Sequence, residues 1–195
     1  MKQLFLLGLT LLIFLACQQP QQKGTQEVEA KSSKEIVIEN IMNRRSIRAY
    51  KPEQIKDEEL SQLIVCAINA PSARNLQPWE VRVIQKPELL AKIDGKSYHN
   101  APTLIVVAGD TRNGYGAFDC GLLTQNILLA AESMDIGTCV VGNVISQLNR
   151  PEAKELMDAM NLPEGYVPLV GISLGYKDQR PEAKPREAVK VQIIK

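Results

Sequence analysis

The chain has 195 residues, of which 45% are hydrophobic and 23% are charged. This composition is typical of one globular domain with a sizeable core, and it excludes a disordered or collagen-like chain. The formal net charge is +1. A chain this close to neutral has no long-range attraction for nucleic acid or acidic membranes, so its basic clusters act locally.

The N-terminus has the pattern of a targeting segment. Lys2 gives a positive start, and residues 4–15 form an apolar run too short for a comfortable membrane span. The run ends at Ala16-Cys17, which resembles the cleavage site of bacterial lipoproteins, where the cysteine becomes the lipidated N-terminus. We therefore expect a lipoprotein signal peptide over residues 1–16, lipidation of Cys17, and a protein anchored at a membrane surface of the cell envelope. The alternative is an ordinary secretory signal with a chance cysteine.

A polar tether and two helices come next. Residues 17–35 are rich in Gln, Glu and Lys, and we expect them to form a flexible tether. Ser32 and Glu35 have the spacing of a capping box, which predicts a helix that continues to about Arg44. Asp57 is the expected N-cap of the second helix.

Helices and strands then interleave without regular βαβ spacing, so we expect an α+β fold with a mixed sheet packed between helices. The expected helix over residues 117–134 is apolar on nearly every side, which indicates that its own domain or a partner subunit covers it all round. The patterns predict strands at 81–84, 103–108 and 167–174, helices at 87–93 and 151–160, a short strand or turn at 139–142, and a last strand or arm at 188–194.

A basic cluster follows the first expected helix. Arg44, Arg45 and Arg48 lie within five positions of one another, together with the hydroxyl of Ser46. Arginine presents a planar fork of donors that matches phosphate oxygens, and serine adds a small donor, so the cluster has the composition of a phosphate-ester site. On residue types alone, a solvated basic patch at a helix end is the simpler interpretation.

The cysteines and the histidine give no metal signature. Beyond Cys17 the chain has Cys66, Cys120 and Cys139, an odd number without paired close spacing, and one histidine, His99. This pattern argues against a disulfide framework and against a zinc site. We expect the three cysteines to be small buried core residues.

Four motifs give the chain a resemblance to a known family. In their order and spacing they resemble the FMN-dependent nitroreductases, and the resemblance extends from about residue 36 to residue 186. Each motif alone is weak, whereas four in order are specific. The motifs are Arg-Arg-Ser-Ile-Arg at 44–48, Pro-Ser-Ala-Arg-Asn-Leu-Gln-Pro-Trp at 71–79, Gly-Thr-Cys-Val-Val-Gly at 137–142, and Gly-Tyr at 175–176 with Lys-Pro-Arg at 184–186.

The resemblance implies a fold and an assembly. It implies an FMN-binding domain over residues 36–195, built as a three-layer sandwich with a mixed, mainly antiparallel sheet flanked by helices. It also implies a homodimer with two FMN sites at the subunit interface and with the helix over residues 117–134 in the dimer core. In the family, C-terminal segments often embrace the partner, which is the expected role of residues 188–194.

The resemblance also implies which residues bind the cofactor. The FMN phosphate is held by Arg44, Ser46 and Arg186, with Arg45, Arg48 and Lys184 nearby. The loop that reaches the isoalloxazine, usually from the other subunit, carries Pro71, Ser72, Ala73, Asn75 and Gln77. The segment that lies against the flavin ring contains Val141 and Gly142.

Simpler interpretations exist for several of these residues. Residues 71–79 also fit a plain helix-to-strand connection, in which Trp79 is a core residue rather than a flavin-stacking one. Asn75 and Gln77 also fit a role in satisfying loop backbone groups. Gly142 also fits a turn glycine, and Arg186 a solvated tail charge.

The expected activity is that of an oxidoreductase with ping-pong kinetics. FMN carries the hydride and the protein binds and orients it, so we expect no catalytic side chain and no metal. The resemblance implies flat, electron-poor acceptors such as nitroaromatics and quinones, with NAD(P)H as donor. Nicotinamide donors are cytoplasmic, whereas the expected signal would export the chain. The sequence therefore does not identify the electron donor. The alternatives are a membrane-anchored flavin- or ligand-binding lipoprotein without turnover, and a specialised flavoenzyme such as a reductive dehalogenase.

Overall fold

The computed structural model describes residues 30–195. The expected signal peptide, the expected lipidation site at Cys17 and most of the expected tether lie outside the described residues. Over residues 30–195, every helix is too short or too polar to cross a membrane.

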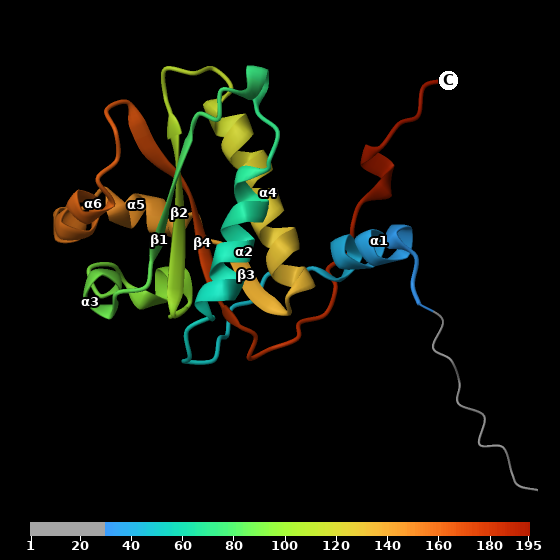
Figure 1. Ribbon diagram of the computed structural model, residues 1–195, viewed down its shortest axis with the longest axis horizontal. Helices are drawn as coiled ribbons and strands as arrows, with labels where there is room; N and C mark the ends of the chain where they lie inside the picture. The colour runs from blue at the N-terminus through green and yellow to red at the C-terminus, as the bar shows by residue number, and fades with distance from the viewer. Residues whose placement is uncertain (1–29) are drawn as a thin grey trace, which may run out of the picture. The chain divides into compact units, whose positions relative to one another are not determined.

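The centre of the fold is a four-stranded antiparallel sheet with the strand order β1-β2-β4-β3 (Figure 1). A bulge interrupts the pairing of β2 with β4 after Val107, where Pro168 faces Ala108. Proline has no N–H to give to a ladder, so a bulge is the usual solution. One parallel bridge joins Ser46 to Thr138, and the mixed character expected for the sheet is confined to it. The strands are β1 (Trp79–Ile84), β2 (Thr103–Asp110), β3 (Ile136–Val140) and β4 (Tyr166–Tyr176).

Helices cover both faces of this sheet (Figure 1). Along β2, Ile105 and Val107 point into the cluster formed with α2 and α4, whereas Leu104 and Val106 point into the cluster formed with α3, α5 and α6. Side chains alternate along a strand, so one buried strand supplies both cores. The expected α+β three-layer sandwich is therefore confirmed. The helices are α1 (Ser33–Asn43), α2 (Asp57–Ile68), α3 (Pro87–Leu90), α4 (Gly116–Ser133), α5 (Asn143–Leu148) and α6 (Lys154–Met160).

Some elements differ from the sequence predictions. The N-cap of α2 is Lys56, whose N–H donates to the Glu59 carboxylate at 3.1 Å, so the prediction of Asp57 as the cap was wrong by one position. α3 ends at Leu90, earlier than expected. α5 was not predicted, because no proline or acidic cap marks its start. Of the strand or arm expected at residues 188–194, the strand is absent: the segment forms a short 3₁₀ turn followed by an exposed end.

The tryptophan and two of the three cysteines beyond Cys17 are buried in the core, as the sequence predicted. Trp79 is buried at the start of β1, as expected. Cys120 and Cys139 are buried free thiols, also as expected, whereas Cys66 is only half-buried. The core therefore depends on ordinary apolar packing and includes two of the cysteines as small hydrophobes.

α1 and α4 define a face that the rest of residues 30–195 leaves uncovered. α1 begins with the predicted capping box, in which Ser32 and Glu35 exchange hydrogen bonds. Asn40 ties α1 to α4 by donating to the Leu129 carbonyl at 2.9 Å. None of the residues of α1 is buried by the rest of residues 30–195, and Phe118 of α4 is 68% exposed. Within residues 30–195, α4 is thus covered by the sheet, by α2 and in part by α1, while Phe118 stays exposed.

Candidate functional site

The basic cluster is fixed by the edge of the sheet. α1 ends at Asn43, and the chain then runs in extended form beside β3, where the Ile47 N–H donates to the Thr138 carbonyl at 2.8 Å. The buried side chain of Ile47 holds this segment on the core. Tyr50 donates from its hydroxyl to the Ile47 carbonyl and closes the turn. The side chains on either side of Ile47 are therefore presented from a rigid backbone.

The C-terminal segment brings further cations to the same place. A small cavity of about 90 Å³ is lined by side chains from both segments. Every residue expected at the FMN phosphate lines this cavity. A carboxylate that was not expected there, that of Glu182, lines it as well. Five basic groups thus face one acidic group, which leaves a strong excess of positive charge. The lining residues are Arg44, Arg45, Ser46, Arg48, Pro181, Glu182, Lys184 and Arg186.

The arginines of this cavity differ in how far their donors are already used. Arg45 donates to the Met42 carbonyl at 2.6 Å and to the Arg44 carbonyl at 3.0 Å, so it also closes the C-terminal end of α1. Arg186 donates to two carbonyls of its own segment. The Arg44 guanidinium makes no hydrogen bond with the described residues, which leaves its whole fork of donors for a ligand.

The segment after β3 continues the strand to which the basic segment is bridged through Ser46 and Thr138. Val141 is buried, and its N–H donates to the Gly171 carbonyl at 2.8 Å, so this N–H is already used within the chain. Gly142 is exposed and has φ −68° and ψ −33°, a conformation open to any residue. A Cβ added to Gly142 would meet no atom within 4 Å. Neither backbone conformation nor packing within residues 30–195 explains why this position is glycine.

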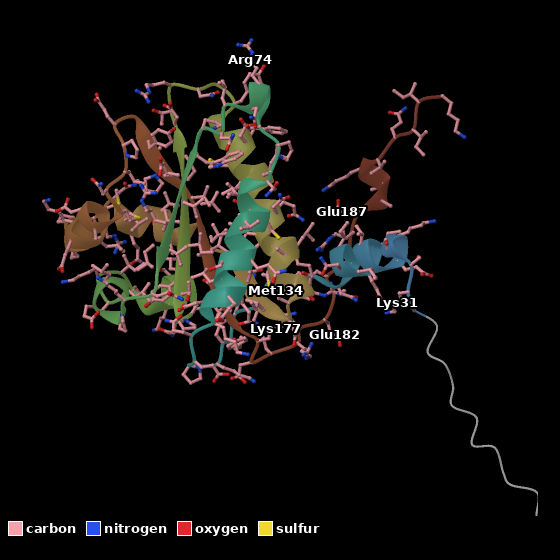
Figure 2. All side chains as sticks on the ribbon, in the orientation of Figure 1. Lys31, Arg74, Met134, Lys177, Glu182 and Glu187 are labelled. Carbon is pink, nitrogen blue, oxygen red and sulfur yellow. The ribbon has the colours of Figure 1, made fainter. Side chains whose placement is uncertain are left out.

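The third predicted segment lies elsewhere. Residues 71–77 pack against the N-terminal end of α4, where the Ala73 N–H donates to Asp119. Figure 2 shows Arg74 of this loop at the opposite end of α4 from Lys177 and Glu182. Since α4 rises about 1.5 Å per residue, the two ends are separated by roughly 25 Å. Within residues 30–195, the loop with Asn75 and Gln77 is therefore separated from the basic cavity by the length of α4.

Two titratable groups beside the basic cavity are shifted toward their neutral forms. Burial, and then the nearby Cys139, raise the pKa of Tyr50 well above its ordinary value. Burial, and then the positive charge of Arg48, lower the pKa of His99. Both causes favour the uncharged form of the imidazole. Within the described part of the chain, no three potential metal ligands of the His, Cys, Asp or Glu type converge.

Sequence reasoning missed two acidic residues near these segments, Glu182 and Asp119. Glu182 lies in a polar, proline-rich stretch where no pattern predicts which side chains face the cavity. Asp119 stands within an apolar helix and is 1% exposed. A single acidic residue in an otherwise apolar helical pattern is the sequence feature that predicts a buried polar side chain.

Comparison with known proteins decides the family. The model of the nitroreductase family matches residues 41–98 and 91–176, which together span most of the described chain. The chain belongs to the nitroreductase family. The prediction of a nitroreductase-like flavin oxidoreductase is thereby confirmed at the level of the family.

Individual relatives support the same assignment. The chain is 33% identical over 170 residues to an NADPH-flavin oxidoreductase of Vibrio harveyi, covering 76% of this chain and 69% of the relative. It is 31% identical over 177 residues to an NAD(P)H FMN reductase of Bacillus subtilis, with 77% and 69% covered. A nitroreductase structure with bound FMN from Desulfitobacterium hafniense superposes with a TM-score of 0.76 at 27% identity, covering 82% of this chain and 98% of that one.

Proposed function

We propose that this nitroreductase-family protein is an FMN-dependent oxidoreductase that passes electrons from NAD(P)H to flat, electron-poor acceptors such as nitroaromatics and quinones. The observation that carries the proposal is the basic cavity, which joins residues 44–48 to residues 184–186. A dianionic phosphate ester needs neutralising cations and oriented donors, and arginine forks supply both. Bound FMN in the related Desulfitobacterium structure supports the choice of ligand.

The residues present fit an FMN molecule at both of its ends. The free fork of Arg44 and the hydroxyl of Ser46 suit the phosphate. The open space beside Gly142 suits a flat ring that lies close to the backbone, because a side chain there would occupy the space instead. The amides of Asn75 and Gln77 suit the pyrimidine edge of an isoalloxazine, which has both donors and acceptors.

We also propose that the functional unit is a homodimer with two sites. An isolated helix of 11 residues is marginal in water, yet α1 has its apolar side chains about half exposed or more. The exposed apolar positions of α1 are Ile36, Val37, Ile38, Ile41 and Met42. A second copy of the chain would cover them. It would also bring its own residues 71–77 to the basic cavity, which one chain leaves distant from that loop.

In this arrangement the protein acts by binding and orienting the cofactor. FMN supplies the chemistry, accepting a hydride from the donor and delivering electrons to the acceptor at the same place. Arg44, Ser46 and Arg186 fix the phosphate and so set where the ring lies. The amides of Asn75 and Gln77 would hold the pyrimidine edge and would favour negative charge there. We assign no side chain to proton transfer.

Turnover by the purified protein tests this function. We expect a yellow protein whose flavin absorbance bleaches on anaerobic addition of NADPH or NADH and returns on addition of a nitroaromatic or a quinone. Initial rates at several fixed acceptor concentrations should give parallel double-reciprocal lines, because donor and acceptor use one site in turn. A yellow protein that bleaches with dithionite but with no acceptor-dependent return would support the binding lipoprotein without turnover. A chain that binds no added FMN would reject all flavin functions.

The membrane anchor is a separate proposal that rests on residues 1–17 of the sequence. We propose that Cys17 is lipidated and holds the protein at a membrane surface of the bacterial cell envelope. Expression in a bacterium with radiolabelled palmitate should label the wild type and send it to the membrane fraction. Cys17→Ser should lose the label. Equal label in both proteins, or none in the wild type, would contradict the anchor without bearing on the flavin site.

A further inference from the structure

Asp119 is a buried carboxylate that has, among residues 30–195, a single hydrogen-bond partner outside its own helix. It lies in the first turns of α4, is 1% exposed, and has the fully buried Cys120 beside it. Its two oxygens accept the Ala73 N–H at 3.1 and 3.2 Å. Taking a carboxylate out of water is unfavourable unless it is compensated, so a buried acid that serves one backbone N–H indicates a specific task.

The loop that receives this bond has an unusual backbone. Arg74, Asn75 and Gln77 have φ values of 56°, 55° and 48°. These values lie in the left-handed region, which asparagine tolerates but which other side chains rarely adopt. A loop with three such residues within four positions keeps this backbone conformation only if other contacts restrain it. Backbone strain of this kind is concentrated at functional sites.

The restraints on the loop are of two kinds. Within it, the Gln77 N–H donates to the Ser72 hydroxyl at 3.0 Å, and the Gln77 amide donates to the Asn75 side-chain oxygen at 3.4 Å. Toward the rest of residues 30–195, residues 71–77 make one local bond, in which the Trp79 N–H at the start of β1 donates to the Gln77 carbonyl at 2.7 Å. The bond from Ala73 to Asp119 is the hydrogen bond that ties the loop to an element distant in sequence. The loop is thus held by hydrogen bonds between its own residues and by one hydrogen bond to a buried side chain, which we call its attachment.

We propose that Asp119 is a positioning residue that holds residues 71–77 so that the side chains of Asn75 and Gln77 are presented to the flavin. This inference rests on the proposed function, in which the loop meets an FMN held by the partner. Asp119 touches neither cofactor nor substrate; it acts through Ala73. Its burial excludes water that would compete for the Ala73 N–H, and its place near the N-terminal end of α4 is favourable for a negative group.

Tryptic cleavage after Arg74 reports on the attachment without reference to activity, because Arg74 is exposed within the loop. We compare wild type, Asp119→Ala and Asp119→Asn, since asparagine keeps a side-chain oxygen that can accept the Ala73 N–H. Cleavage after Arg112, which is ion-paired to Asp110, is the internal control. In Asp119→Ala, cleavage after Arg74 should accelerate about 10-fold relative to Arg112, and in Asp119→Asn it should stay within about 2-fold of wild type.

Flavin binding is the second readout. Asp119→Ala should raise the Kd for FMN by about 10-fold and change the visible spectrum of the bound flavin, while Asp119→Asn restores both. Unchanged cleavage and unchanged Kd in a folded Asp119→Ala protein would overturn the proposal. If Asp119→Ala does not fold, hydrogen exchange of the wild-type Ala73 amide decides: protection supports the attachment, and exchange at the rate of a free loop amide overturns it. If the wild type binds no FMN while cleavage still responds to Asp119→Ala, the flavin assignment fails and the attachment stands.

Discussion

Replacing Arg44 and Arg186 together by alanine is expected to release FMN while leaving the subunits folded and associated. Both guanidinium groups line the basic cavity, and each comes from a different segment of the chain. A hydrogen bond to a charged group contributes about 1.5–3 kcal/mol, so losing two arginines should weaken FMN binding by at least about 100-fold. Titration of the apoprotein with FMN, followed by quenching of flavin fluorescence, measures the change directly.

A matched control separates this effect from a general loss of positive charge. Lys86 and Arg150 are exposed and lie outside the basic cavity, so Lys86→Ala combined with Arg150→Ala removes the same charge. This control should bind FMN with the wild-type Kd. Both double variants should keep the wild-type unfolding temperature of the apoprotein, because the exposed or half-buried side chains contribute little to the core. Wild-type flavin occupancy in Arg44→Ala/Arg186→Ala would show that the phosphate lies elsewhere.

The parts of the fold that sequence patterns predicted are those with long or strongly marked signals. The all-apolar run predicted β2 as a strand, and the long apolar pattern predicted α4 as a helix. The capping box at Ser32 predicted where α1 begins. The six-residue helix α5 offers too few turns for periodicity to be visible. The strand order β1-β2-β4-β3 joins segments far apart in the chain, and no local pattern specifies such pairing.

For the site, the family resemblance predicted residues that the structure places around one cavity, but it did not predict where every group lies. The order of motifs indicated that residues 44–48 and 184–186 share a ligand, and both segments line one cavity. It did not indicate Glu182 in that cavity or the burial of Asp119, because the surroundings of a carboxylate depend on the tertiary fold. Nor did local pattern show that residues 71–77 lie at the far end of α4 from the basic cavity, the observation on which the proposal of a second subunit depends.

Placing charge on the outer face of α1 is expected to break the dimer and empty both flavin sites. Ile38 and Met42 are one turn apart, 51% and 68% exposed, and neither lines the groove between α1 and α4. The double variant Ile38→Glu/Met42→Glu therefore disturbs little within its own chain. If a partner covers this face, each glutamate is forced into an apolar contact at a cost of several kcal/mol, and two-fold symmetry imposes that cost twice.

Sedimentation equilibrium measures the outcome, with FMN titration of the same samples as the second measurement. We expect a monomer that keeps its helical circular dichroism but has lost flavin binding, because one chain does not bring residues 71–77 to the basic cavity. Ser146→Glu/Ala159→Glu adds the same charge at exposed positions of α5 and α6 and should leave the dimer and its flavin unchanged. A dimer that survives Ile38→Glu/Met42→Glu would show that this face of α1 is not the interface. A monomer that still binds FMN as the wild type does would show instead that one chain completes the site, so that residues 71–77 of a partner are not required.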